Sequence, residues 1–537
     1  MKRWNGWGEE STQYPLPTSS AQYLEAQVGA GLLIPDATFE DILKKVPAPK
    51  LPPHSLISTD PEVRARHARG HSMPDWISLR YGTLDTFPDG VAFPNNIEDI
   101  RQLMAYARDN QCALIPYGGG TSVVGHINTL SGIPTITVAL DKMNKLEVLD
   151  RASMLATFGA GIRGPELEQQ LNQAGYTLGH FPQSFEWSTL GGWIASRSVG
   201  TQCLYYGRIE RMFVGGHVET PIGPLDFPVV PASAAGPNLR ELFMGSEGRL
   251  GFITSATMRI QPIPPKEQFT AVFFPNWEEG CAAAMEIVQA HIPVSMVRLN
   301  NPNETETTLQ LTGKTQLVNM AHSGLNLIGI REQRCLMIFG VTGTAATARC
   351  AHQQASAISR SHHGFVVEPV IGPMWHKSRF TTPYLRNTLW ERGYAIDTLE
   401  TAMPWSNILI AMPKIQQAIQ HAAEIFGDKV LVFGHLSHLY TDGASIYITY
   451  LFRRTTQPQE LYSRWLNMKT AASEQIVAFG GTISHQHGIG LDHASYLAAE
   501  KGTLGMKCIK TNLSLFDPDQ IMNPGKLISS QENSYVE

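Results

Sequence analysis

The stretch Pro116-Tyr117-Gly118-Gly119-Gly120-Thr121-Ser122-Val123 decides how the first half of this chain is interpreted. It overlaps the end of the apolar run Cys112–Pro116, which predicts a short buried strand. A strand that ends in three glycines presents backbone N–H groups with no Cβ atoms in the way, and two hydroxyls add further donors. Such a concavity suits a phosphate or diphosphate. Taken alone, the same run is also typical of an ordinary tight turn.

Three further clusters of glycine and hydroxyl residues follow in the same part of the chain. They are Pro182–Trp193, Ser196–Gly200 and Gly245–Ile253. One cluster is compatible with a simple turn, whereas four predict loops that converge on one extended ligand. A flavin dinucleotide has the diphosphate and the large ring system that such loops accommodate.

One glycine motif competes with this interpretation. The run Gly159-Ala160-Gly161-Ile162-Arg163-Gly164 matches G-x-G-x-x-G and precedes a predicted helix. However, no clear second strand ends in an acidic residue where a ribose partner belongs, and Glu186 lies in a loop-like segment. We therefore favour a strand-to-helix turn whose glycines meet a φ requirement over a Rossmann fingerprint.

The length of 537 residues predicts more than one core. We predict an α+β chain with an N-terminal extension (1–86), a cofactor-binding domain (87–265), an α+β cap domain (266–455) and a C-terminal helical segment (456–537) that completes the active site. Proline-rich connectors at 47–53 and 261–266 support these divisions. Within the extension we predict one helix, near Phe39–Val46.

Charge and cysteine usage exclude several classes of protein. The net charge is −5 and no Lys/Arg block is present, so we expect no nucleic-acid partner. The six cysteines are scattered without metal-binding spacing, which favours free thiols in a reducing compartment. No apolar run reaches the roughly 18 residues that span a bilayer, and no secretory signal is evident. We expect a cytoplasmic protein, with peripheral membrane contact and homodimer formation left open.

Histidines and single arginines are the candidates for chemistry in the second half. The pair in His485-Gln486-His487 lies between glycines, where imidazoles can act as general acids or bases, although surface loop histidines are the simpler alternative. A second group is Gly434–His438. A metal site is weakly supported, because no acidic ligand accompanies either group at a recognisable spacing. Arg298 and Arg386 are candidates to hold a phosphate or carboxylate, with a structural role as the alternative.

Taken together, these motifs resemble a known family. P-x-G-G-G-T-S-V, Q-S-F-E-W-S-T-L-G-G-W and S-E-G-x-L-G-x-I are similar to the flavoproteins of the vanillyl-alcohol oxidase type. Within that family, S-H-x-H-G-I-G, D-G-A-S-I-Y, W-N-G-W-G and the run at residues 64–71 resemble the alkyldihydroxyacetonephosphate synthases. The resemblance covers nearly the whole chain and is weakest around residues 300–375.

The resemblance implies a vanillyl-alcohol oxidase/PCMH-type FAD-binding domain with an α+β cap domain. It implies a transferase of ether lipid synthesis that exchanges the acyl group of acyl-dihydroxyacetone phosphate for a long-chain alcohol, through an adduct at flavin N5 without net redox. FAD is expected to be non-covalent, because no histidine or cysteine lies in the loop Gly118–Ser122.

The resemblance also assigns residues. Catalytic roles fall on Tyr447, His485, His487 and Arg298, and substrate binding falls on Arg386 and His438. The implied cofactor-binding residues are Pro116, Tyr117, Gly118, Gly119, Gly120, Thr121, Ser122, Gln183, Ser184, Glu186, Ser188, Thr189, Ser196, Arg197, Ser198, Val199, Glu247, Gly248, Leu250, Gly251 and Ile253.

This sequence departs from the family pattern at one important position. Gln486 replaces the middle histidine of S-H-H-H-G, and glutamine cannot transfer protons at neutral pH. The tail Asn523–Leu527 looks more like the glycolate and D-lactate oxidising relatives, and the missing peroxisomal leader favours a bacterial-like member. Two alternatives therefore stay open. One is an FAD-dependent 2-hydroxy acid dehydrogenase or oxidase, and the other is a non-catalytic flavin- or lipid-binding homologue.

Overall fold

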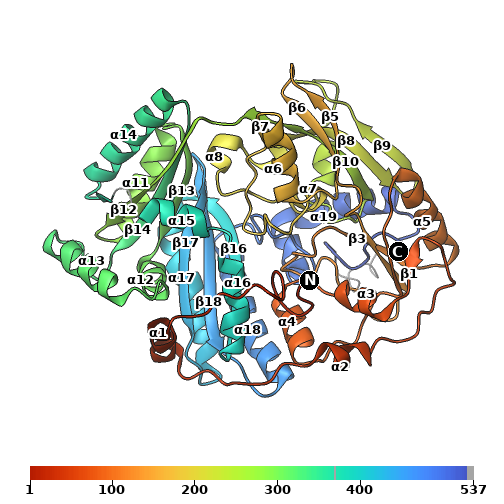
Figure 1. Ribbon diagram of the computed structural model, residues 1–537, viewed down its shortest axis with the longest axis horizontal. Coiled ribbons are helices and arrows are strands. Elements are labelled where there is room, and N and C mark those ends of the chain that lie inside the picture. The colour runs from red at the N-terminus through yellow and green to blue at the C-terminus, as the bar shows by residue number, and fades with distance from the viewer. Residues whose placement is uncertain (368–370, 529–537) are drawn as a thin grey trace.

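The computed structural model describes residues 1–367 and 371–528 (Figure 1). Two groups of β-sheets organise the chain. The sheets that carry the glycine loops lie on the right of Figure 1, and one seven-stranded sheet lies on the left. Among the described residues, no helix combines the length and the hydropathy that crossing a membrane requires.

The first sheet positions the glycine loop. Its strand order is β1-β2-β4-β3, and β4 pairs in parallel with both β2 and β3. The strands are β1 (Ile57–Ser58), β2 (Gly90–Ala92), β3 (Ala113–Tyr117) and β4 (Thr135–Ala139). Helix α5 (Ile97–Asp109) begins at the N-cap Asn96, which accepts a hydrogen bond from the Asp99 N–H, and buries one apolar face. The predicted strand is thus confirmed, and the glycines follow directly at its end.

The second sheet is antiparallel, with the order β5-β6-β10-β8-β9. Its strands are β5 (Leu146–Asp150), β6 (Leu155–Gly159), β8 (Phe213–Thr220), β9 (Gly223–Phe227) and β10 (Phe252–Arg259). Helix α6 (Gly164–Gln173) follows β6, and α7 (Leu190–Ser196) carries part of the predicted flavin loops. Shorter elements are β7 (Tyr176–Thr177), β11 (Gln261–Pro262), α8 (Cys203–Tyr206), α9 (Ile209–Met212) and α10 (Arg240–Phe243).

The G-x-G-x-x-G run lies at the turn from β6 to α6, as predicted. Because β6 pairs antiparallel with both neighbours, this turn is not part of a parallel dinucleotide-binding unit. The reason we gave for the glycines is wrong, since none of the three has a positive φ. Instead, a Cβ on Gly159 or Gly161 would overlap the carbonyl oxygens of Met143 and Leu140. Close backbone packing, and not φ, requires glycine here.

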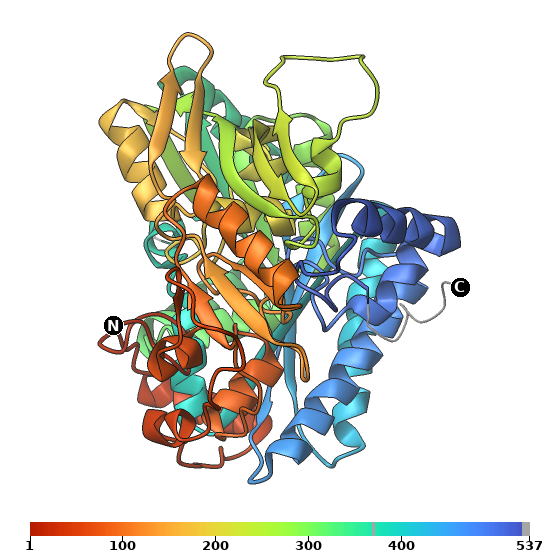
Figure 2. The same cartoon turned by 90° about the vertical axis from the view of Figure 1, so that its right-hand side faces the viewer.

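The seven-stranded sheet has the order β15-β12-β14-β13-β17-β18-β16. Its strands are β12 (Lys266–Phe274), β13 (Val294–Asn300), β14 (Cys335–Gly343), β15 (Phe365–Val367), β16 (Tyr394–Pro404), β17 (Leu431–Leu439) and β18 (Gly443–Arg453). One face packs against α11 (Trp277–Gln289), α14 (Ala345–Ser361), α17 (Trp405–Glu424) and α18 (Pro458–Ala478). Figure 2 shows α17 and α18 side by side along one edge of the molecule.

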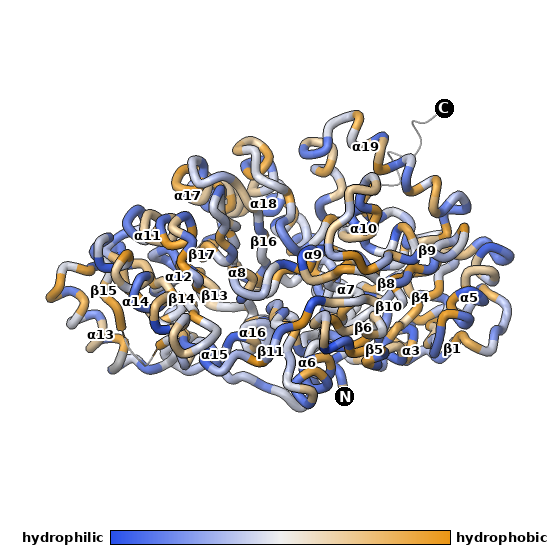
Figure 3. Tube along the Cα trace, turned by 90° about the horizontal axis from the view of Figure 1, so that it is seen from above, coloured by the Kyte–Doolittle hydropathy of each residue, from blue (hydrophilic) through white to orange (hydrophobic). Residues whose placement is uncertain are grey.

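Side-chain alternation along these strands divides the buried apolar residues between the two faces of the sheet. Val272, Val297 and Met337 point into the core beneath the helices, whereas Ala271, Met296 and Ile338 pack on the other face. That second face is covered by α12 (Pro302–Leu311), α13 (Thr315–Leu327) and α15 (Ile371–Ser378). In Figure 3 the turns of α17 alternate between hydrophilic and hydrophobic residues, as expected for a helix with one face on the sheet.

The N-terminal extension has more helices than we predicted. Besides α2 (Phe39–Leu43), it forms α1 (Thr18–Val28), α3 (Pro61–Arg66) and α4 (Met73–Arg80). Helix α2 carries a capping box and was recognisable, whereas α1 has no side-chain cap. Helix α4 is buried on most of its surface, so it shows little amphipathic pattern.

The C-terminal part returns to the first sheet. Helix α19 (Leu497–Phe516) is followed by a segment that pairs with β3 through a parallel bridge between Leu114 and Met522. The Asn523 N–H donates to the Leu114 carbonyl at 2.8 Å, and Lys526 Nζ donates to the Asn128 carbonyl at 2.6 Å. The chain therefore closes the glycine-loop sheet with residues far downstream.

Candidate active site

The loops predicted to bind flavin meet at one place. A Cβ on Gly118 would overlap the Thr189 hydroxyl, and one on Gly119 would overlap the Trp187 carbonyl. A Cβ on Gly248 would lie 2.8 Å from Pro116, and the Glu247 N–H donates to the Ala195 carbonyl at 3.0 Å. The first loop therefore touches the second and the fourth at distances that only glycine permits, and the fourth is bonded beside the third.

A small cationic cavity lies against this convergence. It has a volume of about 150 Å³, and its walls are Lys2, Arg3, Arg66, His67, Tyr117, Gly118, Gly119, Ala139, Asp141 and Arg163. Four side chains that are cationic at neutral pH face a single carboxylate, so an anion is favoured here. Glycine backbone together with these cations fits the diphosphate of FAD. The cations escaped the sequence prediction, because three of them come from the extension and not from a glycine cluster.

Several predicted cofactor residues have side chains that already bond within the protein. Arg197 adopts φ 54° at the end of α7, and its Nε donates to the Met244 carbonyl at 3.0 Å. The Glu247 carboxylate accepts the N–H groups of Ile489 and Gly490 at 2.5 and 2.8 Å. The Glu186 carboxylate accepts from the Tyr384 hydroxyl at 2.9 Å. These three side chains hold the loops in shape, and their role as cofactor contacts stays a prediction.

The hydroxyl and amide side chains of the loops mainly form hydrogen bonds that stabilise the loops. Thr189 accepts from the Gly192 N–H at the start of α7, and Ser122 accepts from the His126 N–H. The other side-chain bonds join Gln183 to the Arg379 carbonyl, Trp193 to Ser188, Ser196 to the Gly192 carbonyl, and His180 to Ser198.

The predicted catalytic residues come together on β17, β18 and the histidine loop. The ring of Tyr447 stacks on His435, with centroids 5.1 Å apart, and meets the edge of His487 at 5.7 Å. His438 stacks on His485 at 5.2 Å. The structure thus brings the two histidine groups of the sequence into one cluster around Tyr447. Burial raises the pKa of Tyr447, so its phenol is neutral at physiological pH.

Glu400 of β16 organises this cluster, and sequence reasoning missed it. The residue is 1% exposed, and its carboxylate Oε1 accepts the N–H groups of Gln486 and His487 at 2.6 and 2.7 Å. It also lies 3.6 Å from His487 Nδ1 and 3.7 Å from His485 Nδ1. Burial acts to raise the pKa of Glu400, but the two histidines and the backbone N–H groups hold it below its ordinary value. The sequence feature that could have pointed to Glu400 is an acidic side chain within a buried strand.

Hydrogen bonds join His485 and His438 to neighbouring side chains. The Tyr440 hydroxyl accepts from Arg208 at 3.3 Å and forms a hydrogen bond with His485 Nε2 at 2.6 Å. His485 Nδ1 faces Glu400 at 3.7 Å. On the other side, the Cys203 Sγ lies 3.5 Å from His438 Nδ1. Burial raises the pKa of Cys203 to about 12, so its thiol is protonated at neutral pH.

Arg298 of β13 lies beside the cluster and is paired. Its Nη2 is 2.5 Å from Glu304 Oε1, and Glu304 Oε2 is 2.9 Å from His435 Nδ1. Burial acts to raise the pKa of Glu304, and the charges of His435 and Arg298 lower it overall. Arg298 therefore reaches Tyr447 through the ring of His435, and its catalytic role stays a prediction.

Arg386, on α16 (Thr382–Glu391), has donors without partners. Its guanidinium lies over the Trp76 ring at 4.3 Å, and Nη1 donates to the His71 carbonyl. Its buried Nε and Nη2 have no partner among the described residues. Burial lowers the pKa of Arg386 to about 10, and Asp397 and Asp75 oppose this. A buried arginine with two free N–H groups is suited to a phosphate or carboxylate.

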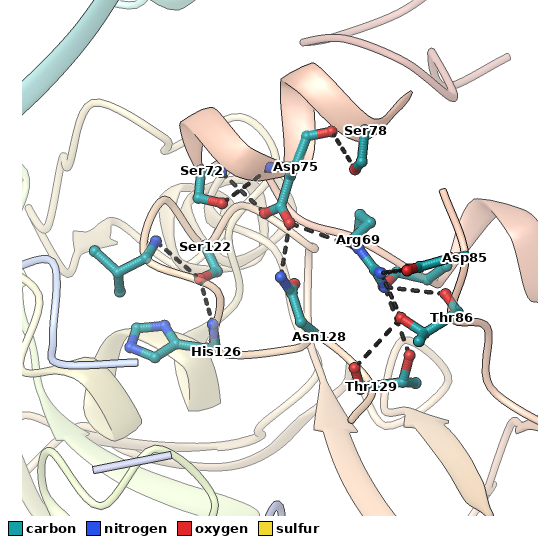
Figure 4. A network of polar contacts seen from close by, with 12 residues as sticks. Arg69, Ser72, Asp75, Ser78, Asp85, Thr86, Ser122, His126, Asn128 and Thr129 are labelled. Carbon is teal, nitrogen blue, oxygen red and sulfur yellow. Dashed lines mark hydrogen bonds and ion pairs between the residues drawn. The ribbon is translucent and has the colours of Figure 1, made fainter. Parts of the chain in front are cut away.

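Asp75 connects α4 to Asn128, in the segment that follows the glycine loop (Figure 4). Its carboxylate accepts from the Ser72 N–H at 3.0 Å and from Asn128 Nδ2 at 2.7 Å, and Arg69 lies 3.9 Å away. Ser122 and His126 lie close by in the same view. Among the described residues, no group of three or more His, Cys, Asp or Glu side chains is arranged to hold a metal ion.

Comparison with known proteins identifies the class. The FAD binding domain model matches residues 88–225, and the model of the C-terminal domain of FAD linked oxidases matches residues 263–527. The chain therefore belongs to the flavoproteins built from these two domains. Within that class it is of the alkyldihydroxyacetonephosphate synthase type, which confirms the predicted family, fold class and cofactor.

The relatives support this over nearly the full length. The alkyldihydroxyacetonephosphate synthase of Dictyostelium discoideum is 29% identical over 93% of this chain and 83% of its own length. The enzyme of Trypanosoma brucei brucei is 26% identical over 98% and 92%. A solved alkyldihydroxyacetonephosphate synthase structure superposes with a TM-score of 0.83 and 26% identity, covering 97% of this chain and 98% of that one.

More distant relatives share less of the chain or only the fold. A mitochondrial D-lactate dehydrogenase of Arabidopsis thaliana is 27% identical over 82% of this chain and 73% of its own length. p-Cresol methylhydroxylase superposes with a TM-score of 0.67 at 12% identity over 93% of this chain and 99% of that one, which establishes a common fold alone. The oxidoreductase alternative is therefore not favoured.

Proposed function

We propose that this chain exchanges the acyl group of acyl-dihydroxyacetone phosphate for a long-chain alcohol and so forms an ether lipid precursor. The observation that carries the proposal is the buried guanidinium of Arg386 on α16, whose Nε and Nη2 have no partner among the described residues. Helix α16 packs against β16, the strand on which Glu400 lies opposite Tyr447 of β18, and Tyr447 is among the groups that influence the pKa of Arg386. An anion site and a set of proton-carrying groups therefore adjoin each other.

The residues have protonation states that suit this exchange. Arg386 binds the phosphate and fixes the position of the carbon between the ketone and the acyloxy group. Burial lowers the pKa of His487, so its neutral imidazole is available to accept a proton from that carbon. Glu400, 3.6 Å away, then stabilises the imidazolium.

The bond from the substrate carbon to the acyloxy oxygen breaks, and its electron pair leaves with the fatty acid as a carboxylate. The alcohol oxygen forms the new C–O bond and gives up its hydroxyl proton to the histidine cluster, while the carbon regains the proton that His487 removed. FAD, held by the glycine loops, would supply an electrophilic ring for this exchange. The neutral phenol of Tyr447 donates a hydrogen bond within the same cluster.

Gln486 is compatible with this role. Its backbone N–H donates to Glu400 Oε1 at 2.6 Å. A glutamine supplies that N–H as well as a histidine does, so the scaffold around His485 and His487 does not depend on a third imidazole. This supports turnover by the present chain over a purely binding role.

One pair of assays tests the proposal. The purified FAD-loaded protein is incubated with acyl-dihydroxyacetone phosphate and labelled hexadecanol, and separately with D-lactate and a dye acceptor. Labelled ether product without dye reduction is the expected result. Dye reduction by the hydroxy acid, or the absence of both activities, would contradict the proposal. A cytoplasmic location with peripheral membrane contact and a homodimer belong to the same proposal, and fractionation and light scattering test them.

A further inference from the structure

The loop Lys2–Gly8 contains the W-N-G-W-G motif. It lies between the glycine loop of the cofactor site and helix α16, which carries Arg386. It is closed on itself, because Lys2 pairs with Glu9 and the Arg3 N–H donates to the Gly8 carbonyl at 2.8 Å. Trp7 and the glycines at its tip are buried. This burial shows that the loop packs against other parts of the protein on both sides.

One end of the loop binds the glycine loop of the cofactor site. Lys2 Nζ donates to the Gly119 carbonyl at 2.7 Å and approaches the Tyr117 hydroxyl at 3.3 Å. The Lys2 carbonyl in turn accepts from Arg66 Nη1 at 3.0 Å. Lys2 and Arg66 both line the cationic cavity against Gly118 and Gly119. This end of the loop therefore forms part of the wall that faces the cofactor's diphosphate.

The other end of the loop binds α16, the helix that carries Arg386. The Trp7 N–H donates to Asn387 Oδ1 at 3.0 Å, and Asn387 Nδ2 donates back to the Trp7 carbonyl at 2.9 Å. A Cβ on Gly6 would overlap Asn387, and one on Gly8 would overlap the Tyr384 ring. Both glycines of the motif are thus required by the close approach of α16.

Two further contacts tie this arrangement to the predicted flavin loops and to Arg386. Tyr384 of α16 donates to Glu186 at 2.9 Å and accepts from Trp187 Nε1 at 3.3 Å. The ring of Trp7 packs edge-on against His71 at 5.0 Å, and the His71 carbonyl is the acceptor for Arg386. The loop therefore contacts the residues on either side of the phosphate-binding arginine.

We propose that the loop Lys2–Gly8 is a positioning element that couples cofactor binding to binding of the substrate's anionic head group. It fixes α16, and with it Arg386, relative to the glycine loop. Bound FAD orders the glycine loop and, through it, the loop Lys2–Gly8. The phosphate then binds Arg386 at a lower cost in conformational entropy, so FAD raises the affinity for the phosphate. The inference rests on the proposed function only for the identity of the phosphate ligand.

The test compares Asn387→Leu with wild type in two binding measurements. The first is the FAD dissociation constant of the apoprotein, followed by flavin fluorescence. The second is the dissociation constant of dihydroxyacetone phosphate for the FAD-loaded protein, followed by calorimetry. We expect the second constant to rise about tenfold, as for the loss of a reciprocal pair of buried hydrogen bonds. We also expect the FAD constant to rise severalfold, although none of the hydrogen bonds of Asn387 is made to the glycine loop.

A double variant measures the coupling itself. Lys2→Met removes the bond to Gly119 from the opposite end of the loop. We expect the FAD constant of Lys2→Met/Asn387→Leu to be clearly smaller than the product of the two single effects predicts, because either change alone already releases the loop. Asn387→Asp, which keeps the acceptor for the Trp7 N–H, is a milder variant in case the leucine protein is unstable.

Thr388→Val is the matched control. Thr388 is on the same helix and donates to the Tyr14 carbonyl at 2.8 Å, outside the loop. It is expected to change both constants by less than twofold. Equal effects of Thr388→Val and Asn387→Leu, or an unchanged FAD constant in Asn387→Leu, would overturn the inference. Neither measurement requires turnover, so a failure of the proposed synthase activity is distinguishable from a failure of this coupling.

Discussion

Replacement of Glu400 by glutamine should separate the charge of this residue from its hydrogen bonds. The amide oxygen of glutamine still accepts the N–H groups of Gln486 and His487, so the histidine loop keeps its course. What is lost is a negative charge 3.6 Å from His487 Nδ1. At an effective dielectric constant near 20, a pair at this distance is worth about 4.5 kcal/mol, or roughly 3 pKa units.

The change should therefore destabilise the imidazolium that forms when His487 accepts a proton. Burial lowers the pKa of His487 and Glu400 opposes this, so the variant should lower that pKa further. We expect kcat to fall about 100- to 1,000-fold at pH 7, in the range seen when a preorganised electrostatic group is removed. The acidic limb of the rate profile should move to lower pH, and the bound FAD should remain.

Stability provides a second readout with a definite sign. The pKa of Glu400 is held below 4.5, so its ionised form stabilises the fold above that pH and the benefit is lost as the pH falls through its folded pKa. The variant should therefore melt below wild type at pH 7, with a smaller difference near pH 4.

A matched control is Glu168→Gln. Glu168 is also buried and accepts the N–H groups of Leu178 and Gly179 at 3.1 and 2.9 Å, but it has no histidine partner. Its variant should keep kcat. Steady-state rates from pH 5 to 9 and thermal melts are the measurements. An unchanged rate and pH profile in Glu400→Gln would refute the electrostatic role assigned here.

Three further outcomes are expected. Tyr447→Phe should abolish ether formation while FAD absorbance per protein stays at the wild-type level, and a fully active variant would remove the phenol from the mechanism. Gly119→Ala should be purified with little FAD, because the added Cβ overlaps the Trp187 carbonyl, and full flavin absorbance would contradict that packing. Burial, together with Asp397 and Asp75, raises the pKa of Asp492 to about 7, although Lys469 and His126 act against this. The acid is therefore favoured in its protonated form, and FAD-free wild type should lose stability as the pH rises from about 4 to about 7. Asp492→Asn should lack this loss when melting temperatures are measured across that range. The same pH dependence of the melting temperature in both proteins would contradict the prediction.

Sequence patterns predicted what is encoded locally. The apolar run before Gly118 became β3, and the helix predicted near Phe39–Val46 became α2, because a buried strand and a capping box are both marked by neighbouring residues. The glycine loops were recognisable for a similar reason, since only glycine allows their close contacts.

The missed residues depend on partners far along the chain. Glu400 acquires its role from Gln486, 86 positions away, and Lys2 from Gly119, 117 positions away. Nothing in the neighbourhood of either residue records such a partner. Helix α4 escaped notice for a different reason, because burial on most sides removes the contrast between faces on which periodicity depends.

The bridge between Leu114 and Met522 has a consequence for biosynthesis. During translation, the glycine-loop sheet emerges from the ribosome about 400 residues before the segment that completes it, as the separation of 398 positions between Asn128 and Lys526 shows. The early sheet must therefore wait with one edge uncovered while the cap is synthesised. We expect stable FAD uptake to be a late event, after residue 526 has emerged, and a nascent chain arrested before Ile521 should retain no flavin.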